Sequence, residues 1–348
     1  MDFAFSAEQD ALRTTARRYL TDRLPLSRVA ELADSDAGWD VASWPELTAL
    51  GWLDEELGPV DHAVVFEEAG YSLYPGPLFA SLALARPAGY RGAEPATLAF
   101  ADPGRPATLA GTAETTCRAE RYGEGWRLTG RKTFVPDLLG AAYAVVLAAA
   151  EEGPGCWLVD LRAGGATLRP LSTRDRTRRL GELILSGTPA TPVVPAAETA
   201  RVFADVRRAA RAALACEAVG VAQRCLDLAL DHARNRKQFG RPIGSYQAIA
   251  HRLADVYTSV ALARSLAYWA SWCVAERDAA ADSAAAAAGA AASDAAVLAA
   301  EAAVQTFGGA GFTWDSPLHR FYRRAQWIAA FDGGPRNQRA GIAAMLLD

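Results

Sequence analysis

One run of residues has the types and spacing that suit a phosphate-bearing cofactor with a flat ring. Arg236-Lys237-Gln238-Phe239-Gly240 is followed directly by Arg241-Pro242-Ile243. Arg and Gln supply planar hydrogen-bond donors, and Gly lets backbone approach a ligand closely. The same run also suits the end of a helix, because basic residues favour the helix C-terminus, Gly240 could cap it and Pro242 prevents its continuation. A cofactor contact and a simple helix end are therefore both open from this segment alone.

A second, glycine-rich motif decides between them. Gln305-Thr306-Phe307-Gly308-Gly309 runs on through Ala310-Gly311-Phe312. With both motifs in this order, the sequence resembles the acyl-CoA dehydrogenase family. The resemblance extends over nearly the whole chain and includes three further segments: Met1-Asp2-Phe3, Phe331-Asp332-Gly333-Gly334 and Asn337-Gln338-Arg339.

The hydrophobic pattern changes twice along the chain and predicts three regions. Residues 1–90 carry helix-period spacing, as in Leu12, Ala16 and Leu20, and residues 91–195 carry short apolar runs such as Tyr143 to Leu147 that are typical of strands. Residues 196–348 return to helical spacing, with an apolar stripe that ends before Arg236. The resemblance implies the same order: an α+β, mainly α fold with an N-terminal helical domain, a middle β-barrel and a C-terminal bundle of the four-helix type.

The resemblance also implies FAD as cofactor and an acyl thioester, acyl-CoA or acyl-carrier protein, as substrate. A carboxylate would remove the α-proton while hydride passes from the β-carbon to the flavin, which gives a 2-enoyl thioester. Family members are usually tetramers in which both C-terminal motifs reach the FAD of a neighbouring subunit. Carried over to this chain, these contacts are Arg236, Gln238, Phe239, Gln305, Gly308 and Gly309.

Two further cofactor contacts follow from the resemblance, and two positions depart from the family pattern. Phe134 matches the aromatic residue that flanks the flavin, and Gln338 matches a glutamine near the cofactor. Pro136 stands where the family has a hydroxyl residue, and Pro has no amide hydrogen to donate. The Thr-Glu-Pro loop of the family has only a faint counterpart in Ala101-Asp102-Pro103.

Asp332 is the candidate base, because it stands where many family members carry a glutamate. Its side chain is shorter by about 1.5 Å, and a misplacement of roughly 1 Å can cost a hundredfold in rate. An N-cap of the last helix, or a turn before Gly333, fits Asp332 equally well. Other relatives place the base on a long helix at the position of Ala210, and Glu217 on that helix is expected to be a carboxylate on the helix face.

Composition excludes several other classes of protein. The net charge of −4 and the absence of a basic tail argue against nucleic acid, and we expect most of Arg174 to Arg179 and Arg207 to Arg211 to be solvated. The Ala-rich run from Ala279 to Ala300 has little drive to enter a membrane. The five scattered cysteines, with no basic and apolar leader, predict a cytoplasmic protein. The dispersed histidines and cysteines predict no metal site.

Three functions are therefore open. The first is FAD-dependent α,β-dehydrogenation of an acyl thioester with Asp332 as base, with an electron-accepting flavoprotein as redox partner. The second is a catalytically degenerate subunit that assembles with a paralogous chain into a heterotetramer instead of a homo-oligomer. The third is a flavoenzyme of different reaction type on the same scaffold, since fold alone does not fix the reaction.

Overall fold

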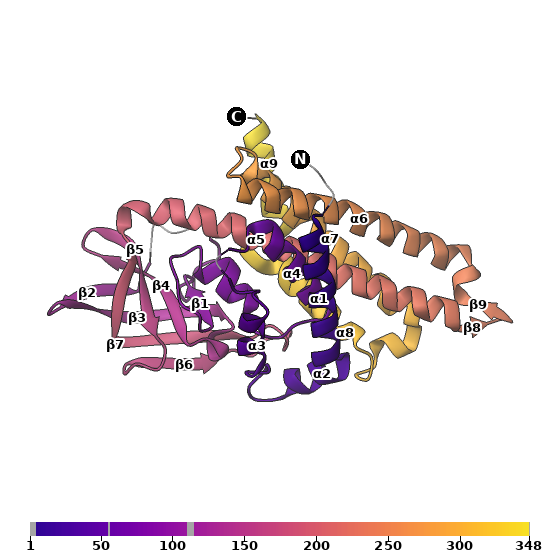
Figure 1. Cartoon of the computed structure of the whole chain (residues 1–348), viewed down its shortest axis with the longest axis horizontal. Helices are drawn as coiled ribbons and strands as arrows, with labels where there is room; N and C mark the ends of the chain where they lie inside the picture. The colour runs from indigo at the N-terminus through magenta and orange to yellow at the C-terminus, as the bar shows by residue number, and fades with distance from the viewer. Residues whose placement is uncertain (1–4, 55, 110–114, 348) are drawn as a thin grey trace.

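Helices occupy the chain up to residue 85, strands lie between residues 96 and 194, and helices follow from residue 196 (Figure 1). The computed structural model describes residues 5–54, 56–109 and 115–347, so the match at residues 1–3 lies outside it. The first region contains α1 (Ala7–Arg23), α2 (Leu26–Asp34), α3 (Ser43–Ala49), α4 (Pro59–Tyr71) and the π-helical turn η1 (Ala80–Ala85).

The first helix begins at a capping box. The Ser6 side chain accepts a hydrogen bond from the amide of Gln9, and the Gln9 side chain accepts one from the amide of Ser6. Two amides that the helix itself leaves unbonded are satisfied in this way. Ala16 and Leu20 are buried, as their spacing predicts.

The middle region closes into the β-barrel that the resemblance implied. Pairings of β4 with β2, β2 with β3, β3 with β7, β7 with β5 and β5 with β4 form a ring, and β1 and β6 add to β4 and β7. A separate apolar core that includes Leu128, Val146 and Val159 fills it. The strands are β1 (Ala96–Ala99), β2 (Arg118–Tyr122), β3 (Gly125–Pro136), β4 (Tyr143–Ala150), β5 (Gly153–Asp160), β6 (Ala166–Pro170) and β7 (Leu180–Val194), with the short turn η2 (Leu138–Gly140) after β3.

The third region is a helical bundle built on two long helices, α5 (Ala196–Asn235) and α7 (Ala281–Phe307). In Figure 1, α5 extends from the barrel at the left toward the β8–β9 hairpin at the right. The remaining elements are β8 (Lys237–Gln238), β9 (Arg241–Pro242), η3 (Ile243–Ser245), α6 (Gln247–Ala275), η4 (Gly308–Phe312), α8 (Leu318–Ala330), η5 (Phe331–Gly333) and α9 (Gly334–Leu347).

The Ala-rich run forms α7, which packs inside the bundle. The segment Ala281–Phe312 is long and apolar enough to cross a membrane by length and composition, but 67% of its most apolar window is buried by the rest of the chain. Alanine gives this helix high propensity and a thin profile, so its neighbours approach closely. Its burial is that of a core helix.

Two glycines let α4 and α5 cross at close range. A Cβ on Gly70 would overlap the backbone of Glu217, and a Cβ on Gly220 would overlap the backbone of Glu67. Any side chain at either position would separate the helices. The crossing thereby holds the Glu217 side chain at a fixed depth inside the molecule.

Candidate active site and cofactor-binding surface

Asp332 lies in the sharp turn between α8 and α9. Its backbone has φ 50° and ψ 38°, in the left-handed region that Asp tolerates better than most residues. Its side chain is buried, and α9 begins two residues later at Gly334. Asp332 is therefore a buried turn residue and does not cap the last helix.

The carboxylate of Asp332 is bound on both oxygens. Its Oδ1 accepts a hydrogen bond from the backbone amide of Leu109 at 2.8 Å. Its Oδ2 receives the Nε of Arg211 at 3.0 Å and an Nη of Arg211 at 2.7 Å. These bonds tie the turn to α5 and to the loop before β2. Most of Arg207 to Arg211 is expected to be solvated, but Arg211 is engaged with the buried Asp332.

Glu217 lies on α5, about two turns after Arg211, in a buried ion-pair cluster. It accepts hydrogen bonds from Arg178 at 2.7 Å and from Arg324 at 2.5 Å, and Arg324 also binds Asp175 at 2.8 Å. Although burial raises the pKa of the Glu217 carboxyl, Arg178 and Arg324 outweigh it and hold that pKa below its ordinary value. Glu217 is thus a carboxylate on a helix face, but that face is buried, and Arg178 is buried too although most of Arg174 to Arg179 is expected to be solvated. Ala210, the alternative base position, is a buried alanine that carries no proton acceptor.

The cluster contains one carboxylate that is poorly matched. Asp137 is buried, and its Oδ2 lies 3.9 Å from Arg178 without a hydrogen bond to any described residue. Burial raises the pKa of Asp137 to about 7, against the opposing charges of Arg178 and Arg324. Both groups are buried, and Asp137 lines only a small cavity, so both fit a structural role.

Aromatic rings fill the region beside the Asp332 turn. Phe331 packs edge-on against Phe79, with ring centroids 5.5 Å apart, and lies 5.5 Å from Trp327. The guanidinium carbon of Arg178 lies 5.0 Å from the rings of both Phe79 and Trp327. Packed rings and a buried cation thus fill the region beside Phe331.

The predicted cofactor contacts on the first motif lie on an exposed hairpin. α5 ends at Asn235 with Arg236 as its C-cap, and β8 and β9 are joined by Phe239 and Gly240 at φ 50° and 82°. A two-residue turn with both φ values positive is a tight hairpin of a type that strongly favours glycine. Phe239 is 93% exposed. The helix thus ends before the glycine, and Gly240 serves the hairpin turn instead of the helix cap.

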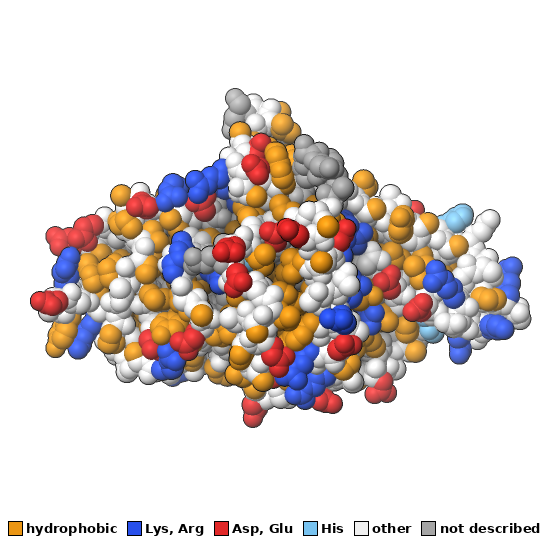
Figure 2. Space-filling model, in the orientation of Figure 1, with side chains coloured by type: hydrophobic (Ala, Val, Ile, Leu, Met, Phe, Trp, Pro, Cys, Tyr) orange, Lys and Arg blue, Asp and Glu red, His pale blue; other side chains and the backbone are white. Residues whose placement is uncertain are grey.

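The second motif lies at the same end of the bundle. The ring of Phe307, in the last turn of α7, stacks on His232 of α5 with centroids 4.1 Å apart. This contact brings Gln305, Gly308 and Gly309 to the end of the bundle that carries Arg236, Gln238 and Phe239. We call these six residues the distal tip. Figure 2 shows Lys and Arg side chains gathered around this end, at the right of the view.

Nothing inside the chain requires a glycine at position 309. A Cβ there would meet no atom within 4 Å, and its backbone is not in the left-handed region. Gly309 is also exposed. A glycine that packing does not demand fits a position that another molecule approaches closely.

Phe134 lies on the barrel, far from the distal tip along α5 (Figure 1). It sits where the pairing of β3 with β7 shifts register between Lys132 and Val135, has φ 53° and is 50% exposed. The bulge turns an aromatic side chain outward from a strand whose neighbours are buried. Phe134 is therefore not a core aromatic.

The loop that stands for the family's Thr-Glu-Pro motif is tied to the barrel interior. Asp102 receives the ammonium of the fully buried Lys132 at 2.6 Å, and Lys132 also donates to the carbonyl of Phe100. Burial lowers the pKa of Lys132, and the bond with Asp102 opposes that shift. The acidic group of this loop is engaged inside the chain and is not presented to a ligand.

Comparison with known proteins agrees with this architecture. Residues 202–347 match the family model of the acyl-CoA dehydrogenase C-terminal domain. The chain is 31% identical to acyl-CoA dehydrogenase IpdE2 of Mycolicibacterium smegmatis, over 97% of this chain and 99% of that protein. The chain belongs to the acyl-CoA dehydrogenase family.

Two solved acyl-CoA dehydrogenase structures of similar shape are complexes of unlike chains by their titles. A variant of the Tcur3481–Tcur3483 steroid ACAD superposes with a TM-score of 0.84 at 30% identity, over 98% of each chain. The ChsE4–ChsE5 complex from Mycobacterium tuberculosis gives a TM-score of 0.86 at 27% identity, over 100% of this chain and 99% of that one. Acyl-CoA dehydrogenases are flavin oxidoreductases, and the α+β fold predicted from the sequence is confirmed.

The residues of this acyl-CoA dehydrogenase fit FAD at two separate places. At the distal tip, the exposed Arg236 suits the pyrophosphate of FAD, and the open space at Gly309 would let the cofactor approach the backbone closely. On the barrel, Phe134 offers a ring to the flavin. Gln338 differs, because it is buried in the bundle against Gly289 of α7, and its Oε1 has no hydrogen-bond partner among the described residues. Its predicted cofactor contact stays a prediction.

Proposed function

We propose that this chain is the non-catalytic subunit of a heteromeric, FAD-dependent acyl-CoA dehydrogenase. A paralogous chain would supply the base and the acyl site, and this chain would lend its distal tip to the flavin. The FAD would supply the hydride acceptor for oxidation of the acyl β-carbon. The observation that carries the proposal is the contrast between the buried, doubly bound Asp332 and the exposed, open distal tip.

Asp332 is poorly arranged to act as a base. A general base needs a free lone pair directed at the substrate carbon, with its environment set to favour proton uptake. Here Arg211 and the Leu109 amide bind both oxygens, so each oxygen already has a partner within the chain. Aromatic rings also pack around the neighbouring Phe331, and Asp332 lines none of three cavities in the described part of the chain.

The distal tip is well arranged to serve another subunit. Phe239 is exposed there, and Figure 1 shows the barrel at the other end of α5 from the β8–β9 hairpin that carries it. One chain therefore does not bring Phe134 and Phe239 to one flavin. Two chains in opposite orientation do so readily, and closed symmetric assembly is the common arrangement of oligomers.

The alternative is a self-sufficient dehydrogenase in which Asp332 acts as the base. It requires that substrate binding displace Arg211 from Asp332 and move the rings of Phe79 and Trp327. Apo geometry often tightens or shifts in a substrate complex, which is the argument for this alternative. An electron-accepting flavoprotein as partner and a cytoplasmic location are further parts of the proposal, with acyl-carrier protein as the alternative to CoA as thioester carrier.

The test compares the chain purified alone with the chain co-expressed with an acyl-CoA dehydrogenase paralogue from the same organism. We expect the chain alone to be folded, nearly colourless and inactive, and the co-purified pair to be yellow and to reduce an electron acceptor with acyl-CoA. A saturating flavin content and turnover by the chain alone would reject the subunit proposal. A pair that binds FAD only when Phe239 is intact would support it.

A further inference from the structure

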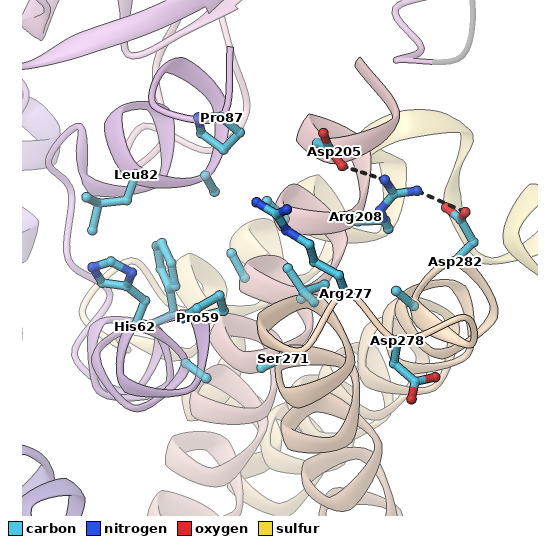
Figure 3. A pocket seen from close by; sticks show the side chains of 18 of the residues that line it. Pro59, His62, Leu82, Pro87, Asp205, Arg208, Ser271, Arg277, Asp278 and Asp282 are labelled. Carbon is cyan, nitrogen blue, oxygen red and sulfur yellow. Dashed lines mark hydrogen bonds and ion pairs between the residues drawn. The ribbon is translucent and has the colours of Figure 1, made fainter. Parts of the chain in front are cut away.

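A cavity of about 670 Å³ lies outside the region of Asp332, the ion-pair cluster of Glu217 and the distal tip. It opens between the start of α4, the turn after η1, the first half of α5 and the α6–α7 connection (Figure 3). Its volume falls within the range of roughly 300–1,000 Å³ that is usual for sites of small organic ligands. The cavity is thus large enough for a molecule of that size.

The cavity is separate from the buried ion-pair cluster. Ala212 and Ala213 of α5 line it, whereas Glu217, Arg178 and Arg324 do not and instead bind one another. Asp332 does not line the cavity either. A ligand there would not compete for the region beside Asp332.

The walls of the cavity are mostly apolar. α4 contributes Phe66, and the turn region of η1 contributes Leu82 and Ala83. α5 contributes small side chains, which leave the space open: Ala209, Ala212 and Ala213. An apolar body would be held here by the burial of its surface.

Most charges at the mouth neutralise one another. Arg208 donates to Asp282 at 2.9 Å and also bonds to Asp205, as the dashed lines in Figure 3 show. Arg201 pairs with Asp205 at 3.2 Å and with a neighbouring glutamate on the same helix. Asp278 keeps its charge: its carboxylate accepts a hydrogen bond from the backbone amide of Ala280 at 2.7 Å but forms no ion pair with a described residue.

Arg277 differs from these residues. No hydrogen bond or ion pair joins its side chain to any part of the chain that the structure describes. In Figure 3 its side chain extends across the mouth, whereas the carboxylate of Asp278 points the other way. Its backbone has φ 52°, which is unusual for a non-glycine residue and sets the direction of the side chain. A cation without a partner is thus presented at the edge of an apolar cavity.

His62 adds no charge to this arrangement. Burial lowers the pKa of its imidazole to about 4, with the charge of Arg86 acting in the same direction. Its Nε2 has no hydrogen-bond partner among the described residues. The imidazole is neutral at ordinary pH, so the electrostatic preference at the mouth comes from Arg277.

We propose that this cavity is a binding site for an amphipathic carboxylate, a molecule with an apolar body and one anionic group. The body lies against Phe66, Leu82 and the alanines of α5, and the carboxylate meets the guanidinium of Arg277. A planar guanidinium is well suited to bind a carboxylate through two parallel hydrogen bonds. The site is independent of where the base of the dehydrogenation lies.

Calorimetric titration of the full chain with decanoate tests this proposal, with 1-decanol and decylammonium as neutral and cationic probes. We expect decanoate to bind at one site and about tenfold more tightly than 1-decanol, because a charge-assisted pair is lost with the alcohol. Decylammonium should bind most weakly. Equal affinity for the three probes, or no binding of decanoate, would overturn the proposal.

Two variants locate the site. Arg277→Gln should remove the roughly tenfold preference for decanoate over 1-decanol, whereas Arg252→Gln, at an exposed position of α6 outside the cavity, should preserve it. Ala212→Leu should abolish decanoate binding and keep or raise the melting temperature, since the added atoms enter empty space. Unchanged decanoate affinity in either Arg277→Gln or Ala212→Leu would place the ligand elsewhere and refute the assignment.

Discussion

Two regions of the chain differ in how their polar groups are satisfied. One is the interior around Asp332 and Glu217, and the other is the distal tip. In the interior, Asp332 is bound by Arg211, and Glu217 is bound by Arg178 and Arg324, all within one chain. At the distal tip, Arg236 and Gln238 are exposed and Phe239 protrudes in a left-handed conformation. The polar groups of the interior are paired within the chain, whereas those of the distal tip are free to contact another molecule.

This difference separates stability from function. Buried ion pairs hold a fold in place mainly because the loss of one partner leaves a charge without compensation. Exposed, conformationally unusual aromatic residues add little to stability, and such backbone outliers gather at functional sites. Substitutions in the interior should therefore change unfolding, and substitutions at the tip should change flavin binding.

The largest effect is expected in the interior. Glu217→Gln would leave the buried Arg178 and Arg324 without their shared carboxylate and should lower the free energy of unfolding by about 3–5 kcal/mol. Glu198→Gln, on an exposed part of the same helix, should cost less than about 1 kcal/mol. Urea unfolding of the two variants measures both values. Equal losses would show that the interior cluster is not structurally different from a surface pair.

The next largest effect is expected at the distal tip. Gly309→Val meets no atom within 4 Å inside the chain, so its melting temperature should match that of the wild type. In the assembled enzyme it should weaken FAD binding about a hundredfold, because its side chain enters the space that the cofactor needs. Gly164→Val, at a similarly open glycine of the barrel, is the matched control. Full flavin content in Gly309→Val would remove the tip from the cofactor site.

A smaller, pH-dependent effect is expected at Asp137. Burial raises the pKa of Asp137 to about 7. The folded state therefore keeps this carboxyl protonated at pH values where an exposed aspartate is already ionised. Stability from this group is complete below about pH 4 and is lost as the pH rises toward 7. Asp137→Asn should remove that loss and unfold at a higher urea concentration than the wild type at pH 8, by about 1–3 kcal/mol in free energy.

The control for this prediction is Asp231→Asn, at an exposed aspartate near the end of α5. Its difference from the wild type should be the same at pH 5 and pH 8. For Asp137→Asn, the difference should grow between these two values. A difference that does not depend on pH would show that Asp137 is ionised in the folded chain throughout this range.

Much of the fold could be predicted because it depends on local pattern. The apolar stripe that ends before Arg236 corresponds to α5, which ends at Asn235, and the run from Tyr143 to Leu147 lies within β4. The two C-terminal motifs could also be placed, since each spans a few consecutive residues at the end of a helix. They lie at the same end of the bundle because α5 and α7 both run toward it, so that His232 near the end of α5 stacks on Phe307 at the end of α7.

The ion-pair cluster could not be predicted in the same way. Glu217 and Arg324 are 107 positions apart in sequence, and Glu217 and Arg178 are 39 apart. Sequence spacing shows which helix face a residue occupies, but it does not show which element covers that face. Gly70 and Gly220, which let α4 pack closely on α5, are the sequence signal for this crossing, because closely packed helices need small residues where they cross.

The most direct test of the subunit proposal is the turnover of the assembled, two-chain enzyme with Asp332→Asn in this chain. Asparagine tolerates the left-handed backbone of residue 332 and keeps an acceptor for the Leu109 amide, so the turn should persist. If the partner supplies the base, turnover per bound flavin should stay within about threefold of the wild type. A fall of about a thousandfold with flavin still bound would identify Asp332 as the base and contradict the account.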